Sequence, residues 1–306
     1  MILSFDIEEH DRIEAAYGLD IDHALRVEYA ERMESATRRL LDQLARHQTL
    51  ATFFIVGEIA RTHPHLVRDI HAAGHEIASH SHAHENIHRL TPVAFHHDLV
   101  ASKDGLEQLI GEPIVGFRAP TFSITRRTAW AIDILAEAGF RYDSSIFPVR
   151  HDRYGVVDAP RTPFIVTGNQ HSLIELPPAT LKLGSYHLPV AGGGYFRLFP
   201  PALMRWGIAQ QQRLPGGVAM LYFHPWEFDV GQPRLPLKRL SRWRTYVGIR
   251  QTTARLDALL QRYRFQRAID IVESLREDEL SRFLLGDSRN ASIKSVESAQ
   301  LANVRE

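Results

Sequence analysis

Side chains that can do chemistry gather where five apolar, strand-like segments end. They are Asp6, Glu8, His80, His84, Arg118, Asp143 and His224. In parallel α/β folds the carboxyl ends of the strands meet at one edge of the sheet and carry the active site. The sequence therefore predicts a single site that combines carboxylates, imidazoles and one guanidinium.

Two carboxylates and two histidines are arranged as a metal site would need them. Alternate side chains of a strand share a face, so Asp6 and Glu8 point together while Ile7 packs behind them; a solvated acidic strand end is the plainer interpretation. His80 and His84 lie at a strand end and in the following turn, where both imidazoles can face one cation. The spacing alone is weak evidence, because 17 histidines in 306 residues give roughly one His-x-x-x-His pair by chance.

The roles of Arg118 and His224 each have a plain alternative. Arg118 ends a strand and is well placed to pair with Asp6 and keep it ionised, although a surface salt bridge would also fit. His224 follows the apolar run 218–223, so a core histidine with a satisfied ring is the alternative to a catalytic one. Trp226, two residues later, suits a pocket wall or the core equally well.

Three glycines at 192–194 precede Tyr195. They lack the Gly-Lys-Ser/Thr of a phosphate loop and the spacing of a dinucleotide-binding loop. A loop that approaches a sugar closely, with its aromatic side chains nearby, and a simple tight turn both fit the pattern.

The elements that must position these residues alternate between strand and helix. The apolar patterns predict strands at 2–6, 52–56, 75–79, 114–118, 140–143, 173–176 and 218–224, and a further strand at 265–271. Helices are predicted at 30–46, 64–74, 91–111, 125–138, 201–212 and 245–262. About seven alternations without a change in composition favour one parallel, barrel-like α/β domain. Residues 276–306 are polar with little periodicity and are interpreted as a disordered tail.

The composition excludes several classes of protein. Lys plus Arg and Asp plus Glu both number 36, and the zero net charge argues against a broad electrostatic grip on nucleic acid. The absence of cysteine excludes disulfides, thiolate nucleophiles and iron–sulfur clusters. No apolar run approaches a membrane helix, and the N-terminus lacks the pattern of a signal peptide. We therefore expect a cytoplasmic protein, at most peripheral to the inner membrane.

Residues 1–272 resemble the polysaccharide deacetylases of the NodB-homology type, carbohydrate esterase family 4. Within that family they most resemble the exopolysaccharide-locus branch associated with bacterial exosortase systems. The motifs that carry the resemblance are Phe5-Asp6-Ile7-Glu8-Glu9, Thr52-Phe53-Phe54, His75-Glu76-Ile77-Ala78-Ser79-His80-Ser81-His82-Ala83-His84, Phe117-Arg118-Ala119-Pro120, Tyr142-Asp143-Ser144-Ser145 and Phe223-His224-Pro225-Trp226-Glu227.

The resemblance implies a distorted (β/α) barrel, a NodB-like domain over residues 1–275, with one divalent ion, usually zinc. It makes His80 and His84 metal ligands, and Glu8 the metal carboxylate, because Ile7 occupies the usual position of that ligand. The implied catalytic residues are Asp6 as general base, Arg118 to orient it, His224 as general acid and Asp143 to tune His224. Thr121, Phe122, Tyr195 and Trp226 are the implied substrate-binding residues.

The implied function is hydrolysis of N-acetyl groups on hexosamine units of a bacterial exopolysaccharide or its precursor. A metal-independent hydrolase of another C–N bond, of the allantoinase-like type, stays open because of Ile7. A catalytically inactive carbohydrate-binding relative is the third interpretation. The implied partner is an N-acetylated polysaccharide or oligosaccharide, and the oligomeric state is not predicted.

Overall fold

The computed structural model describes residues 1–151 and 153–286, and in these ranges nine strands form one sheet in the order β10-β1-β2-β3-β4-β5-β7-β6-β11. Their bounds are β1 Ile2–Ile7, β2 Thr52–Ile55, β3 Glu76–Ser79, β4 Gly116–Phe117, β5 Tyr142–Asp143, β6 Phe164–Thr167, β7 Ser172–Glu175, β10 Met220–Phe223 and β11 Ser281–Leu284. The neighbours from β10 to β7 are all parallel. This row of seven parallel strands confirms the predicted α/β class.

The row of parallel strands curls back toward its first member. Pro178, three residues after the end of β7, forms a parallel bridge with Met220 of β10, and Gly192 forms another with Tyr222. A Cβ atom at Gly192 would lie 1.7 Å from the carbonyl oxygen of Tyr222, so only glycine permits this approach. The contact gives β10 neighbours on both sides, as the predicted distorted barrel requires.

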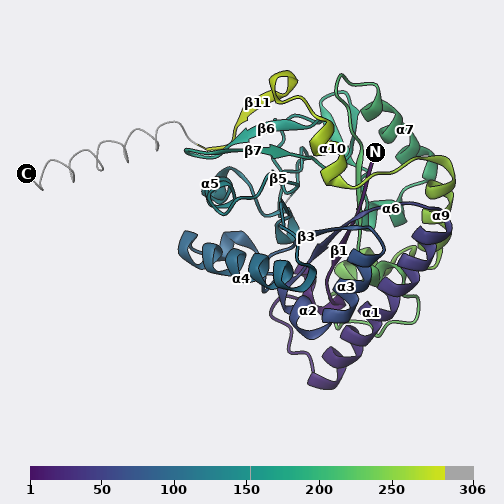
Figure 1. The fold of residues 1–306 in the computed structure, drawn as a ribbon. Coiled ribbons are helices and arrows are strands. Elements are labelled where there is room, and N and C mark those ends of the chain that lie inside the picture. Colours follow the sequence, from purple (N-terminus) through teal and green to yellow (C-terminus); the bar gives the residue numbers. More distant parts are fainter. Residues whose placement is uncertain (152, 287–306) are drawn as a thin grey trace, which may run out of the picture.

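Ten α-helices in the described ranges surround the strands, and Figure 1 shows them around the outside of the sheet. Their bounds are α1 His23–Arg46, α2 Gly57–Thr62, α3 Pro64–Ala72, α4 Pro92–Ile110, α5 Trp130–Glu137, α6 Gly193–Leu198, α7 Pro201–Gln212, α8 Arg239–Tyr246, α9 Thr252–Arg262 and α10 Ala268–Ser274. The strands of the barrel are apolar and fully buried on the helix-facing side. Phe5, Ile7, Phe53 and Ile55, for example, belong to the main core cluster.

Helix α4 illustrates how local signals set the boundaries. The Thr91 hydroxyl accepts a hydrogen bond from the Ala94 N–H, Pro92 occupies the first turn, and Gly111 ends the helix at φ +74°. Threonine supplies the acceptor of an N-cap, proline has the φ that the first turn needs, and glycine tolerates the left-handed conformation at the C-cap. The predicted helix at 91–111 is therefore confirmed.

Two predictions near the C-terminus are wrong. The single helix expected at 245–262 is split into α8 and α9, because Gly248 takes φ +72° and lies close against the Arg197 carbonyl. The strand expected at 265–271 is largely α10, which begins where the Asp270 carboxylate accepts a hydrogen bond from the Arg267 N–H. Only Gln266 bridges to the sheet, beside Ile2.

Two strand pairs were not predicted. Strands β8 (Thr180–Leu183) and β9 (Tyr186–Pro189) form a separate hairpin. Strand β11 pairs with β6 within the segment expected to be a tail; residues 287–306 of that segment lie outside the described residues.

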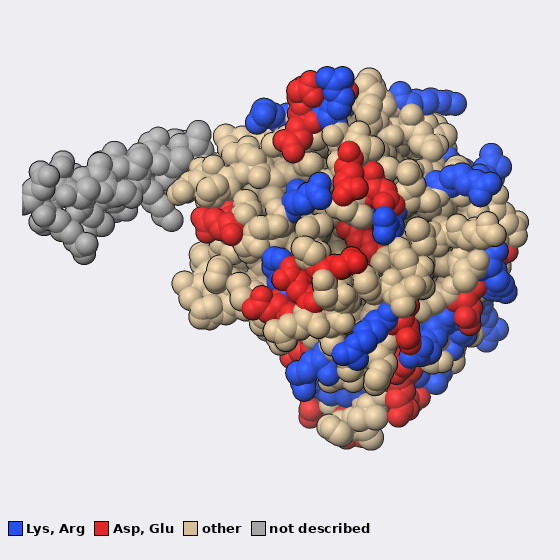
Figure 2. All heavy atoms as spheres, in the orientation of Figure 1, with Lys and Arg blue, Asp and Glu red and all other residues tan. Residues whose placement is uncertain are grey.

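The surface carries charges of both signs, as the zero net charge implies. Figure 2 shows Lys and Arg intermixed with Asp and Glu, for example along α1 at the lower right. In the described part of the chain no helix has the length and apolarity needed to span a membrane.

Candidate active site

The register of the sheet brings the predicted residues to one end of the barrel. Ser79 pairs with Phe117, and Phe117 with Asp143, so that His80, Arg118 and Ser144 come next along three adjacent strands. On the other side Phe5 pairs with Phe223, which places Asp6 beside His224. Asp6 and Glu8 share the face that points into the barrel, while Ile7 is fully buried in the core.

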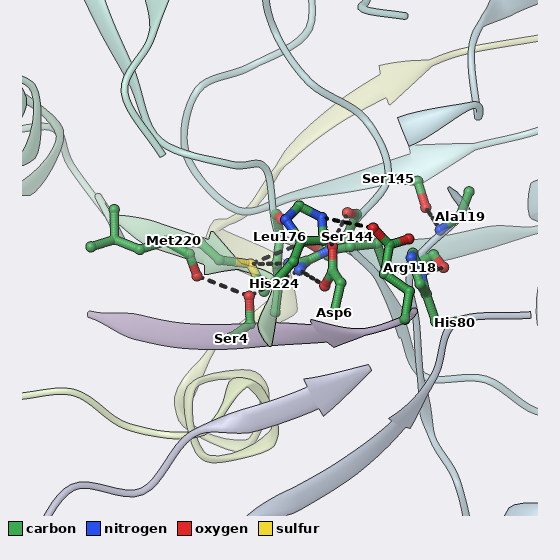
Figure 3. Close-up of polar contacts among 12 residues, drawn as sticks. Ser4, Asp6, His80, Arg118, Ala119, Ser144, Ser145, Leu176, Met220 and His224 are labelled. Atoms are coloured by element: carbon green, nitrogen blue, oxygen red, sulfur yellow. Dashed lines mark hydrogen bonds and ion pairs between the residues drawn. The ribbon is translucent and has the colours of Figure 1, made fainter. Parts of the chain in front are cut away.

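Arg118 and Asp6 form a buried ion pair at the centre of this site (Figure 3). Arg118 is fully buried, and its Nη1 donates to Oδ1 of Asp6 at 2.5 Å and to the Ser4 hydroxyl at 2.9 Å. Its Nε and Nη2 donate to the carbonyl and hydroxyl oxygens of Ser144. The Phe54 ring lies 4.0 Å from the guanidinium carbon. Such a network fixes the orientation of Asp6.

Glu8, His80 and His84 converge on one point from two segments. One ligand atom from each lies within 4.8 Å of the other two. Nε2 of His84 is 2.6 Å from Oε2 of Glu8, yet this buried nitrogen makes no hydrogen bond of acceptable geometry. Two ligand atoms that face each other in this way fit a shared cation better than a hydrogen bond.

The surroundings of this trio also fit a metal ion. Nδ1 of His80 lies 2.7 Å from the Arg118 carbonyl oxygen, which fixes the ring and leaves Nε2 for a ligand. Burial lowers the pKa of His80 to about 4, so the imidazole is neutral at pH 7, as a metal ligand must be. Burial would raise the pKa of Glu8, but the charges of His84 and His224 lower it below its ordinary value. A neutral imidazole and a carboxylate are the donors that zinc accepts.

The loop that carries His84 is held by a helix. The carboxylate of Asp98 on α4 accepts hydrogen bonds from the N–H groups of His82 and Ala83, at 2.7 and 2.9 Å. Ser81 and His84 have φ values of +63° and +58°. Left-handed backbone at two residues other than glycine is strained, and such strain persists where surrounding contacts fix it, as these do.

His224 is paired with a carboxylate that the sequence analysis did not assign. Its Nδ1 lies 2.8 Å from Oε1 of Glu227, and the backbone N–H of His224 donates to the same oxygen at 3.1 Å. Its Nε2 faces the site, 3.8 Å from Asp6 and 3.7 Å from Glu8. Burial lowers the pKa of His224, but Glu8, Glu227 and Asp6 together raise it to about 9. The imidazole is therefore charged at neutral pH.

Asp143 does not have the expected role beside His224. Ser145 donates a hydrogen bond to its Oδ1 at 2.5 Å, and Ser145 also accepts one from the Ala119 N–H. Burial raises the pKa of Asp143 to about 6, and its neighbour Glu175 has a pKa raised further by burial and by Asp143 itself. Glu227 takes the place beside His224 instead, because the turn Pro225–Phe228 brings it back onto the ring from only three residues away.

A groove of about 530 Å³ lies beside this centre and takes in three of the four predicted substrate-binding residues, Thr121, Tyr195 and Trp226. Phe122 instead packs its ring against Phe147, Tyr154 and Tyr222, so it supports the wall from behind. Trp226 also touches the site itself. Its Nε1 donates to Glu8 at 3.3 Å and its ring stacks on His224 at 5.4 Å.

Arg197 and Glu227 are the site residues that the sequence analysis missed. Nε of Arg197 donates to Oε2 of Glu227 at 2.8 Å, and its Nη1 donates to the carbonyl oxygens of Thr245 and Val247. A signal for Glu227 existed. Pro225 marks the first position of a turn, and a Glu at the third position of such a turn can accept a hydrogen bond from the N-cap N–H, as in a capping box. Arg197 carried no such signal, since its partners come from distant segments.

Comparison with known proteins assigns both halves of the chain to sequence families. Residues 22–142 match the polysaccharide deacetylase family, and residues 144–273 match a domain of unknown function. Residues 22–142 therefore form a polysaccharide deacetylase domain. The deacetylase match includes His80, His84 and Arg118, whereas Asp6 and Glu8 precede it and His224 falls in the second match.

Curated relatives match about a third of this chain. A chitooligosaccharide deacetylase of Bradyrhizobium sp. (strain ANU 289) is 28% identical over 100 residues, 33% of this chain and 43% of that protein. A peptidoglycan-N-acetylglucosamine deacetylase of Bacillus cereus is 30% identical over 98 residues, 32% of this chain and 36% of that protein. The shared segment is thus less than half of either relative. These matches do not distinguish the exosortase-associated branch, which stays a prediction.

Two solved structures share the fold over most of the chain. One is from Mycobacterium smegmatis and is described provisionally as a polysaccharide deacetylase; its TM-score is 0.59 at 24% identity, over 92% of this chain and 91% of that one. The other is the Puue allantoinase, with a TM-score of 0.57 at 17% identity, over 89% and 88% of the two chains. At these identities the likeness concerns the fold.

Proposed function

We propose that this chain is a metal-dependent hydrolase that removes N-acetyl groups from hexosamine units of a polysaccharide or its precursor. The observation that carries the proposal is the convergence of Glu8, His80 and His84 beside Asp6 and His224. A base, an acid and three ligand atoms are the set that amide hydrolysis at a metal requires. The family assignment and the names of the curated relatives agree with this reaction.

The proposed cofactor is one divalent ion, expected to be zinc, held by Glu8, His80 and His84. Bound there, it would polarise the acetamido carbonyl and lower the pKa of a water molecule from 15.7 to roughly 7. Two histidines and one carboxylate leave coordination positions open, as in catalytic rather than structural zinc sites.

The proton transfers are proposed for Asp6 and His224. Arg118 holds Oδ1 of Asp6, so Oδ2 is the atom that accepts a proton from the attacking water. Nε2 of His224 donates a proton to the leaving amine, because Nδ1 is bonded to Glu227. The Glu227 carboxylate at Nδ1 favours the protonated form of His224 that this step needs. Acetate and a free hexosamine amine are the products.

The substrate contacts are proposed for the groove. Thr121 lines the groove at φ +58°, and a backbone N–H there would stabilise the developing oxyanion. Tyr195 and Trp226 offer aromatic faces on which sugar rings can pack. We propose an exopolysaccharide of the exosortase-associated branch as the natural substrate.

Elemental analysis of the purified protein tests the metal site, with acetate release from chitotetraose measured in parallel. About one ion per chain is expected in the wild type and in Glu9→Ala, whose carboxylate pairs with Arg12 instead. Glu8→Ala and His80→Ala should each lose the ion and the acetate release.

The other outcomes decide against this mechanism. A wild type that takes up no ion, even after incubation with zinc, would exclude it and favour the metal-independent C–N hydrolase. Ile7 is the observation behind that alternative. It is buried and occupies the position where the family usually has its metal carboxylate, so only Glu8 is left for that role. A chain that binds sugar but releases no acetate would be the inactive carbohydrate-binding relative.

A further inference from the structure

The groove beside the active site carries an excess of positive charge. Among its lining residues are four arginines and one acid, Glu14. Glu14 is paired with Arg89 outside the groove at 2.5 Å, and Arg197 is paired with Glu227. These two pairs account for the groove's acid and for one of its four arginines.

The other three arginines, Arg150, Arg153 and Arg244, are exposed and have no ion pair with any residue in the described ranges. Asp152, which lies between two of them in the sequence and outside those ranges, offsets at most one of the three charges. The chain as a whole has zero net charge. The local excess is therefore a property of this groove and not of the whole protein.

Aromatic rings accompany these arginines. Tyr154, Tyr195, Trp226 and Trp243 line the same groove, and Trp243 is 52% exposed on α8. Flat apolar rings suit the faces of sugars, and arginine recognises carboxylate and phosphate through a planar set of donors. A cleft lined by charges of one sign also concentrates ligands of the opposite sign.

We propose that the groove binds an N-acetylated carbohydrate that carries anionic groups, carboxylate or phosphate, close to the unit that is deacetylated. The proposal rests on the proposed deacetylase activity, since Trp226 and Thr121 connect the groove to Glu8, His224 and the strand end at Arg118. An acidic polymer would supply carboxylates, whereas a nucleotide- or lipid-linked precursor would supply phosphates.

Three probes separate these possibilities in the full chain. They are a tetrasaccharide of alternating glucuronate and N-acetylglucosamine, UDP-N-acetylglucosamine, and neutral chitotetraose. Binding by calorimetry and acetate release are both measured for the wild type and for Arg150→Gln/Arg153→Gln/Arg244→Gln. The matched control is Lys238→Gln/Arg239→Gln/Arg242→Gln, which removes three exposed positive charges that do not line the groove.

We expect an anionic probe to bind the wild type at least ~10-fold more tightly than chitotetraose, because hydrogen bonds between charged partners are the strong ones. The preference should weaken with added salt and disappear in the triple variant, while the control keeps it. Preference for the glucuronate probe identifies a polymer as the source of the charge, and preference for the UDP-sugar identifies a phosphate.

Several results would overturn the proposal. Equal binding of charged and neutral probes would do so, and so would a preference that survives in the triple variant or is lost equally in the control. If the three arginines affect only sedimentation with anionic phospholipid vesicles, the surface is a membrane contact instead. Anionic binding without acetate release from any probe would contradict the proposed function while leaving the anionic groove in place.

Discussion

Replacing Glu227 by glutamine should shift the alkaline loss of activity to a lower pH. The pKa of His224 is raised from 6.5 to about 9 by its three carboxylate neighbours, which corresponds to about 3 kcal/mol in favour of the charged ring. Because Arg197 can only donate, the amide oxygen of the new glutamine must face Arg197, and its NH₂ group must face Nδ1 of His224. Nδ1 then has to accept a hydrogen bond, which favours the neutral ring.

The size of the effect follows from the bond that is lost. A hydrogen bond to a charged partner contributes about 1.5–3 kcal/mol, so the pKa of His224 should fall by roughly one to two units. Because the acid must be protonated to act, the alkaline limb of the pH–rate profile should move down by the same amount. Acetate release measured from pH 5 to 10 records this limb.

A neighbouring acid supplies the control. Asp229 lies at the end of the same turn and pairs with Arg32 at 2.8 Å, so Asp229→Asn should leave the limb in place. If the limb lies at the same pH in the wild type and in Glu227→Gln, His224 is not the acid that titrates there, and the proposed proton transfer is wrong.

Two further substitutions test the framework of the site. Arg118→Met should lower the free energy of unfolding by about 3–5 kcal/mol in urea titrations, because it leaves Asp6 buried without its partner. Adding Asp6→Asn should recover part of this loss. If the losses of the two single variants simply add in the double variant, the two side chains are not coupled. Gly192→Ala should cost about 1–3 kcal/mol more than Gly216→Ala by the same measurement, because its Cβ would strike the Tyr222 carbonyl while Gly216 has open space around it. Equal losses would show that this close approach is unimportant.

The sequence predicts the site best where the alternation of side chains along a strand decides which residues point into it. Alternation along β1 correctly predicts that Asp6 and Glu8 share a face and that Ile7 enters the core, because side chains of a strand alternate strictly. The seven parallel strands were likewise predictable, because short apolar runs alternate with helical patterns along the chain. The hairpin β8–β9 was not, since its strands are short and carry little alternation of apolar and polar residues.

The missing parts depend on contacts between distant segments. The chain breaks between α8 and α9 at Gly248. There the backbone lies against the carbonyl group of Arg197, about fifty positions earlier in the chain. Helical periodicity continues through that glycine, so the pattern predicts one helix. The partner of His224 shows the same limit: the family resemblance implies Asp143, and only the folded turn shows that Glu227 lies against the ring.

Arg197 connects the proposed substrate groove to the proposed proton donor, His224. Its guanidinium binds Glu227 on one side and the carbonyl groups at the end of α8, a wall of the groove, on the other. A relative that exchanged this wall for another would also reposition the guanidinium and so alter the proton affinity of His224. Across such relatives, a change in the preferred sugar should therefore be accompanied by a change in the preferred pH, and the two traits should not evolve independently.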